Sequence, residues 1–261
     1  MLTGCSAAYN GERLFSKAAA FNTTLQKDAT PEQYAEAIRN FEQVTQKAAG
    51  TAWAARAHVA IGSLYALQKQ YANARQAFGL AIQNYNQYRT LCQSARYAIA
   101  KTYEAEQQWD EAVKLYEEIA DYYPLTQMGL EAPLYIAAGY TKHQETELAA
   151  KAYESAAHRY AKLIPDLPTP EAALTVKGYL VLAYQQIGEW DDAVTLLEEM
   201  ESAPQQVNRP LVLLSLGSIY QAKRGDAAKA QALYTKLAEE FPDHPFGKIA
   251  KARLLAPTTT R

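Results

Sequence analysis

Few residues of this sequence have the spacings that catalysis or metal binding requires. The histidines form neither HExxH nor any other close metal-ligand spacing, in which side chains on adjacent helical turns would hold a zinc ion. No GxSxG nucleophile turn, GxGxxG motif or phosphate-binding glycine loop occurs. Acidic pairs such as Glu117-Glu118 and Glu239-Glu240 stand near lysines in helical stretches, as expected of solvated helix faces. The sequence therefore predicts no enzyme, no metal site and no cofactor.

The two cysteines indicate different roles. They lack the CxxC spacing of a redox or zinc site, and Cys92, before a helical stretch, is expected to be a buried, unreactive thiol. Leu2-Thr3-Gly4-Cys5 resembles a bacterial lipobox, whose cysteine becomes the acylated N-terminus of a lipoprotein. By that resemblance, Ser6 after the cysteine implies the outer membrane. Lipoprotein precursors carry a basic and apolar leader before the box, but only Met1 precedes it here, so a chance tetrapeptide is the alternative.

Composition narrows the class of protein. The 261 residues include 26 Lys+Arg and 28 Asp+Glu, a formal charge of −2, which leaves no basic surplus to neutralise nucleic-acid phosphates. No apolar run reaches the roughly 18 residues of a membrane-spanning helix. The 49 alanines far outnumber the 12 glycines, and the 11 prolines fall mostly between apolar-periodic stretches, a balance typical of helices. The sequence predicts an all-α protein that does not bind nucleic acid.

An alanine followed four residues later by an aromatic or aliphatic residue recurs along the chain. The intervals between these alanines are 37, 38, 37, 44 and 37 residues. Such a register indicates an internal repeat of nearly constant length. The alanines are Ala37, Ala74, Ala112, Ala149, Ala193 and Ala230.

A second pattern precedes each of the last five alanines: an apolar residue, a small residue, two variable positions and tyrosine. The spacing places Ile61 and Tyr65 on one helix face, and the small Gly62 lets a second helix approach closely. Gly188 is expected to end its helix in the left-handed conformation, where Lys69 and Gln107 stand in other repeats. The five tyrosines are Tyr65, Tyr103, Tyr140, Tyr184 and Tyr220.

Together these motifs resemble the tetratricopeptide repeat (TPR), in which a W-x-x-L-G-x-x-Y helix is followed by an A-x-x-x-F helix and a proline. The resemblance implies an all-α TPR α-solenoid, a right-handed superhelix of about six helix-turn-helix repeats plus a C-terminal capping helix. The first repeat is degenerate, with its first helix expected over roughly residues 11–27.

This repeat fold sets the expected domain boundaries. Residues 1–10 form a lipobox remnant and tether, residues 11–255 a single solenoid domain, and residues 256–261 a disordered tail. The capping helix is expected over residues 245–255. Three prolines within residues 161–170 predict an extended linker at one junction between repeats.

Of the 19 tyrosines, eight fall on packing positions of the repeat, so most of the aromatic surplus is expected in the core. The remaining candidates for surface positions are Tyr85, Tyr88, Tyr97, Tyr122, Tyr123 and Tyr160.

Within the family, the first helices of successive repeats line a concave groove that binds another protein. Repeats that grip C-terminal carboxylates place asparagines where this chain has Ser63 and Lys101, so that clamp is incomplete here. Some of the groove positions will instead pack only against neighbouring repeats. The positions implied by the resemblance are Arg56, Val59, Ser63, Tyr97, Lys101, Glu104, Leu134, Ala138, Lys142, Thr175, Leu182, Gln185, Leu211, Leu214 and Ser218.

Two functions remain open. The first is a non-catalytic scaffold in the bacterial periplasm, anchored to the outer membrane by lipidated Cys5 and binding envelope or outer-membrane proteins. The lipobox and the long repeats resemble the outer-membrane-assembly lipoproteins of the BamD type, with the CpoB type and pilus-assembly lipoproteins as neighbouring possibilities. The second is a cytoplasmic TPR adaptor in which Cys5 is an ordinary residue.

Overall fold

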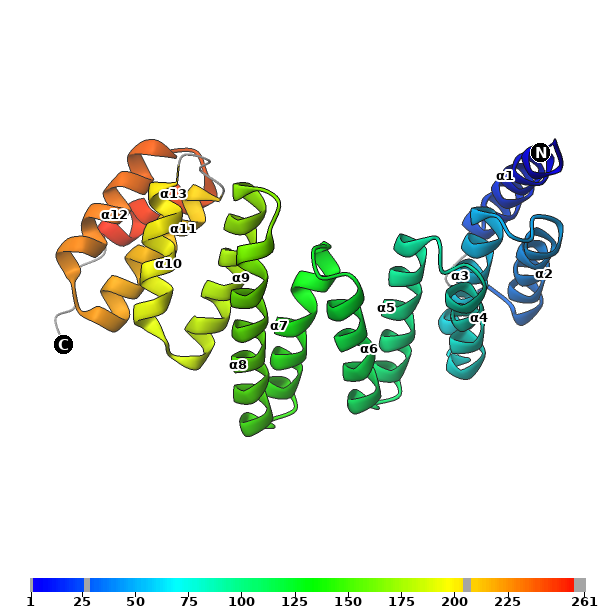
Figure 1. The fold of residues 1–261 in the computed structure, drawn as a ribbon, viewed down its shortest axis with the longest axis horizontal. Helices are drawn as coiled ribbons and strands as arrows, with labels where there is room; N and C mark the ends of the chain where they lie inside the picture. Colours follow the sequence, from blue (N-terminus) through cyan, green and yellow to red (C-terminus); the bar gives the residue numbers. More distant parts are fainter. Residues whose placement is uncertain (1, 26–28, 204–207, 256–261) are drawn as a thin grey trace. The chain divides into compact units, whose positions relative to one another are not determined.

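The computed structural model describes residues 2–25, 29–203 and 208–255, with side chains from residue 8 onward (Figure 1). Within these ranges the chain forms thirteen α-helices and no strand, which confirms the all-α prediction. The chain divides into two compact units, Met1–Ala132 and Pro133–Arg261, and the boundary falls inside α7 (Gln127–Lys142).

The first unit contains three helix pairs, and consecutive helices pack against each other. Figure 1 shows neighbouring helices running side by side in opposite directions. The rings of Phe41, Phe78 and Tyr116, at the repeat's aromatic position, are almost fully buried. The helices are α1 (Leu2–Thr23), α2 (Pro31–Lys47), α3 (Ala52–Leu67), α4 (Tyr71–Asn84), α5 (Arg89–Ala105) and α6 (Trp109–Tyr122).

The second unit repeats this arrangement. The helix α9 packs against both α8 and α10, while α11 packs against α12, which is covered by α13. As predicted, the last helix occupies residues 245–255 and caps the unit. The helices are α8 (Thr146–Leu163), α9 (Pro170–Ile187), α10 (Trp190–Ser202), α11 (Arg209–Ile219), α12 (Ala227–Glu240) and α13 (Pro245–Leu255).

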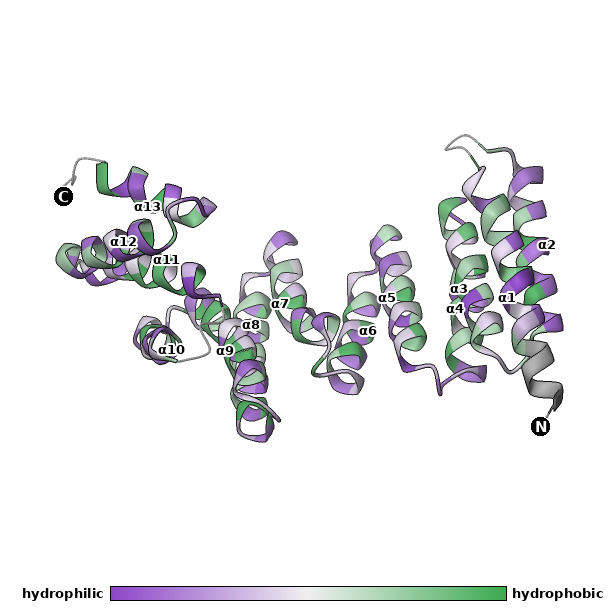
Figure 2. Cartoon of the chain, turned by 90° about the horizontal axis from the view of Figure 1, so that it is seen from above, coloured by the Kyte–Doolittle hydropathy of each residue, from purple (hydrophilic) through white to green (hydrophobic). Residues whose placement is uncertain are grey.

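Buried small residues let the two helices of a pair approach closely. A β-carbon added to Gly62 would lie 2.6 Å from the Phe78 ring, and one on Gly217 would lie 2.5 Å from the Tyr234 ring. The remaining helix faces are more polar, and Figure 2 shows hydrophobic and hydrophilic residues alternating along each helix. Amphipathic helices of this kind bury one stripe and leave the other to water.

The tyrosine of the second sequence pattern marks where the first helix of a pair ends. At four of the five tyrosines, Tyr220 excepted, the carbonyl oxygen accepts a hydrogen bond from the amide five residues later, for example 2.9 Å from Gln70 N to Tyr65 O. The residue before that amide is left-handed, as in a Schellman turn. Gly188 adopts this conformation as predicted, and three residues with side chains do the same. Their φ angles are +59° at Lys69, +60° at Gln107 and +63° at Gln144.

The last repeat contains one extra residue between its tyrosine and its alanine. Nine positions separate Tyr184 from Ala193, but ten separate Tyr220 from Ala230. The extra residue is absorbed by a π-helical turn over Tyr220–Arg224, the usual way in which a helix takes up an insertion. The left-handed Gly225 then closes the turn, so the alanine returns to its packing position.

Three expectations differ from the structure or lie outside it. The helix α1 begins at Leu2, so the helix covers residues 2–10, which the sequence analysis assigned to a tether. Of the expected linker 161–170, only residues 167–169 lack helix, because α8 continues to Leu163 and a 3-10 turn occupies Ile164–Asp166. The expected tail, residues 256–261, lies outside the described residues.

Three of the tyrosines expected at the surface are buried instead. Tyr85 and Tyr123 directly follow α4 and α6, where they fold back onto the helix pair. Tyr160 is fully buried, with its ring 5.7 Å from that of Tyr179. Tyr97 and Tyr122 are exposed, as expected.

Candidate functional site

The predicted groove residues of α3 lie on one face of that helix. Arg56 and Ser63 are exposed, and Val59 is half-buried. The Arg56 guanidinium lies 4.7 Å from the centre of the Trp53 ring. The Ser63 hydroxyl donates to the carbonyl oxygen of Val59 at 3.0 Å. This face therefore offers a basic group and a small apolar surface.

The predicted groove residues of α5 are bonded among themselves. Lys101 Nζ lies 2.6 Å from a carboxylate oxygen of Glu104, whose other oxygen accepts a hydrogen bond from the Tyr116 hydroxyl. Tyr97 is exposed and meets the Tyr116 ring edge-on at 6.0 Å. A partner would have to compete for Lys101 and Glu104, so Tyr97 is the most available of the three.

The predicted residues of α7 differ in exposure. Ala138 and Lys142 are exposed, whereas Leu134 is half-buried.

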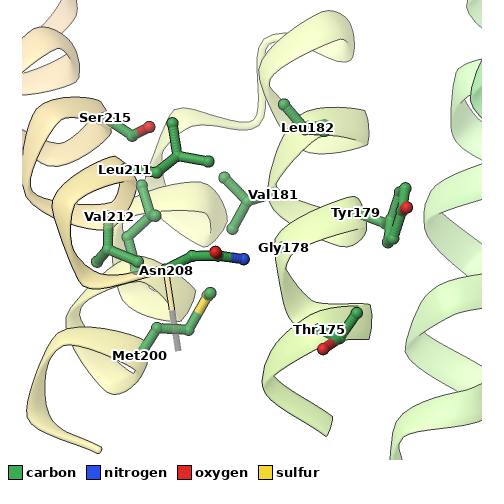
Figure 3. A pocket seen from close by; sticks show the side chains of 11 residues that line it. Thr175, Gly178, Tyr179, Val181, Leu182, Met200, Asn208, Leu211, Val212 and Ser215 are labelled. Carbon is green, nitrogen blue, oxygen red and sulfur yellow. The ribbon is translucent and has the colours of Figure 1, made fainter. Parts of the chain in front are cut away.

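In the second unit, α9, α10 and α11 enclose a hollow of about 290 Å³ (Figure 3). Three predicted groove residues line it: Thr175 and Leu182 from α9, and Leu211 from α11. Both leucines are nearly half exposed, at 47% and 46%. Because large apolar side chains are usually buried, two exposed leucines on one hollow mark a candidate contact surface.

The lining of this hollow is mostly apolar. Figure 3 shows Val181 and Leu211 facing each other across the space between α9 and α11, with the Met200 side chain below them. Asn208, just before α11, extends its side-chain amide toward Gly178. A hollow of this composition suits an aliphatic side chain, with an amide positioned to bond a peptide backbone.

A second hollow adjoins the first, and Ser215 lines both. The other three predicted residues of this unit line the second hollow: Gln185 from α9, and Leu214 and Ser218 from α11. All six predicted positions of α9 and α11 thus line two adjoining hollows, which together we call the α9–α11 groove. Whether these residues bind a partner stays a prediction.

Several residues of this groove were not predicted from the sequence. Met200 and Asn208 line the first hollow and Lys223 the second, and none occupies a groove position of the family. Arg253 of α13 reaches Ser218, with 2.6 Å between Nη1 and the hydroxyl oxygen. Repeat register does not show these contacts, because they come from a second helix, a loop, a π turn and the capping helix.

Several groups with shifted pKa values lie outside the α9–α11 groove. Burial lowers the pKa of His58 and raises the pKa of Cys92, but both belong to the first unit. In the second unit, burial raises the pKa of Tyr184, which lines neither hollow. Shifted pKa values are common where proteins perform acid–base chemistry.

Within residues 2–25, 29–203 and 208–255, no three His, Cys, Asp or Glu side chains cluster as metal ligands would. In the same part of the chain, no helix has the length and apolar character to span a membrane.

Family models match three segments of the chain. Models of the tetratricopeptide repeat match residues 94–126 and 211–244, and a further model of that repeat matches residues 32–89. No curated protein matches the sequence.

Several solved structures are similar to the chain at low identity. A chain of the APC/C hetero-tetramer Cut9-Hcn1 is 12% identical, with a TM-score of 0.45. The match covers 86% of this chain but only 40% of the length of the Cut9-Hcn1 chain. A thermophilic TPR protein of Thermus thermophilus is 20% identical, with a TM-score of 0.46 over 77% of this chain and 98% of its own. PilW, a type IV pilus biogenesis factor, is 15% identical, with a TM-score of 0.46. The match covers 92% of this chain and 98% of the PilW chain.

The matched segments coincide with the observed helix pairs, with their buried alanines and close-packed aromatic rings. Residues 32–89, 94–126 and 211–244 of the chain are therefore tetratricopeptide repeats.

Proposed function

We propose that this protein is a non-catalytic scaffold that binds a segment of another protein in the α9–α11 groove. The observation that carries the proposal is the convergence of all six predicted inner-face residues of α9 and α11 on two adjoining hollows. The first hollow is apolar and edged by two exposed leucines, which gives a partner surface to bury.

Affinity capture from the native cell tests this proposal. The protein with Leu182→Ser and Leu211→Ser is compared with wild type, and captured proteins are identified by mass spectrometry. A matched control carries Leu67→Ser and Leu80→Ser, two other exposed leucines. We expect the groove variant to lose its specific partners and the control to keep them, while circular dichroism shows unchanged helicity in both. Equal capture by all three proteins would refute the proposed site.

The predicted positions of the first unit and α7 receive a separate test. The pair Tyr97→Ala and Leu134→Ala removes an exposed ring and a half-buried side chain. Weakened partner capture by this variant would extend the binding surface beyond α9 and α11. Unchanged capture would confine it to the second unit.

We further propose that the scaffold works in the bacterial envelope, held at the outer membrane by lipid chains on Cys5. The support is the lipobox-like Leu2–Cys5 and the following Ser6. Each buried methylene of an acyl chain contributes about 0.8 kcal/mol of membrane affinity, so two or more chains give a lasting anchor. Intact mass of the protein made from its native gene would show the acyl groups, and Cys5→Ser is expected to release it from the membrane fraction.

Two outcomes decide between this location and its alternative. An unmodified Cys5 in a chain found in the cytoplasm would establish the cytoplasmic TPR adaptor. If the chain is acylated, the captured partners assign its pathway: outer-membrane assembly as for BamD-type lipoproteins, envelope division as for CpoB, or pilus assembly.

A further inference from the structure

Two basic side chains lie near the second hollow of the groove: Lys223 lines it, and Arg253, which lines a neighbouring hollow beside Tyr234, reaches Ser218 in its wall. Lys223 lines that hollow, with Nζ 4.6 Å from the centre of the Trp190 ring. Arg253 donates from Nη1 to the Ser218 hydroxyl and to the Tyr234 hydroxyl, both at 2.6 Å. Within the described residues neither forms an ion pair, whereas the nearby Arg224 is paired with Asp191.

Arg253 has donors to spare. A guanidinium carries five N–H groups, and both hydrogen bonds of Arg253 use Nη1. Its Nε and Nη2 make none within the part of the chain that the structure describes. Ser218 lines the second hollow, so Nη1 of Arg253 reaches the wall of that hollow, while the side chain itself lines a neighbouring hollow beside Tyr234 and Leu254. The second hollow is therefore a basic site next to an apolar one.

The two hollows are a fixed distance apart. Leu211 at the first and Ser218 at the second are seven residues apart on α11, which is about 10 Å along a helix. An extended peptide covers roughly 3.3 Å per residue. Two of its side chains would reach both hollows if they stood three positions apart.

Building on the proposed function, we propose that the α9–α11 groove selects extended protein segments in which an aliphatic residue and an acidic residue stand three positions apart. The aliphatic side chain enters the hollow lined by Val181, Leu182 and Leu211. The acidic side chain accepts hydrogen bonds from Arg253 and lies beside Lys223. Charge-assisted hydrogen bonds of this kind are stronger than neutral ones, so the basic end supplies specificity while the apolar hollow supplies contact area.

Synthetic peptides test the proposal. Fluorescein-labelled, C-terminally amidated nonapeptides of glycine and serine carry Leu at position 3 and Asp at position 6, or the reverse order. Binding to the full chain is followed by fluorescence anisotropy at low salt. We expect binding at least tenfold tighter than for the same peptides with Asn in place of Asp, and an equal loss when Leu is replaced by Ser. Peptides with Leu and Asp adjacent are expected to bind as weakly as the Asn peptides.

Protein variants locate the acidic contact. Lys223→Gln and Arg253→Gln are expected to abolish the preference for Asp over Asn, and Lys248→Gln, on the exposed side of α13, to keep it. Because Arg253 also ties α13 to α11 and α12, Lys223→Gln provides a test that leaves those bonds in place.

The outcomes of these experiments distinguish the proposed peptide-recognition rule from the proposed scaffold function. Leu-dependent binding with no preference for Asp overturns the acidic contact and leaves the scaffold function standing. Tighter binding of a free C-terminal carboxylate than of an internal Asp overturns the choice of an acidic side chain. If no peptide binds, the proposed recognition rule is wrong, and capture with the Leu182/Leu211 variant still decides the scaffold function independently.

Discussion

Gly62 of α3 lies directly against the ring of Phe78 in α4, so close that an added β-carbon would sit 2.6 Å from two ring carbons. The ring is fully buried and has little room to move. We therefore expect Gly62→Ala to lower the free energy of unfolding by about 1–3 kcal/mol through overpacking, measured by urea denaturation followed by circular dichroism.

Gly79, one residue after Phe78, provides the matched control. It lies inside α4 with no atom within 4 Å of an added β-carbon. Because glycine weakens a helix interior, Gly79→Ala is expected to raise the free energy of unfolding by about 0.5–1 kcal/mol. A similar loss of stability in both variants would show that close approach is not what Gly62 provides.

In the turns between paired helices, glycine is expected to stabilise the fold, whereas a residue with a side chain weakens it. Lys69 is exposed and has a φ of +59°, which costs a residue with a side chain roughly 1 kcal/mol. Lys69→Gly is expected to raise the free energy of unfolding by about 0.5–1 kcal/mol. Gly188→Ala, at a φ of +84°, is expected to lower it by a similar amount. Thermal melts of the two variants would contradict the argument if both shifted in the same direction.

Glu201 links α10 to two basic residues and makes part of the stability depend on pH. Lys236 Nζ and Arg209 Nη2 lie 2.6 and 2.9 Å from its carboxylate. The hydrogen bond from Lys236, followed by the charges of Lys236 and Arg209, holds the pKa of Glu201 below its ordinary 4.5. A lowered folded-state pKa gives stability that is present above about pH 4.5 and lost as the pH falls through the folded value.

The free energy of unfolding of two variants is compared with that of wild type at pH 7 and at pH values below 4.5. Glu201→Gln is expected to be less stable than wild type at pH 7, and the difference is expected to shrink steadily below pH 4.5. Glu239→Gln, at an exposed carboxylate with no ion pair in the described residues, should follow the wild-type curve. A constant difference between Glu201→Gln and wild type at all pH values would disprove the linkage.

Cys92 is expected to be inert in the folded protein. Its side chain is only 2% exposed, its sulfur donates to the carbonyl oxygen of Tyr85 at 3.4 Å, and burial raises the pKa of the thiol. The thiolate is the reactive form, so a Cys5→Ser chain should react with a thiol reagent only as fast as it unfolds. Adding Ser155→Cys, at an exposed position of α8, should give one rapidly labelled thiol. Rapid labelling of the Cys5→Ser chain without Ser155→Cys would contradict the burial of Cys92.

The repeat motif predicted most of the fold because each motif residue has a local task. The tyrosine of the first helix marks the carbonyl that closes the turn, and the small residue marks where the two helices approach each other. These tasks recur at a fixed spacing, so periodicity alone locates them. Local motifs did not predict the burial of Tyr85 or Tyr160, because that burial depends on which neighbouring helix covers the end of α4 and α8.

The sequence by itself determined that the chain is helical, where its repeats lie, and which positions of α9 and α11 share an inner face. Helical periodicity and side-chain size decide those properties within about 40 residues. The tertiary structure alone decided that these positions surround two adjoining hollows, that Lys223 lines one of them, and that Arg253 reaches its wall at Ser218. Those two side chains reach the groove from a π turn and from the capping helix, and their positions depend on how separate helices pack.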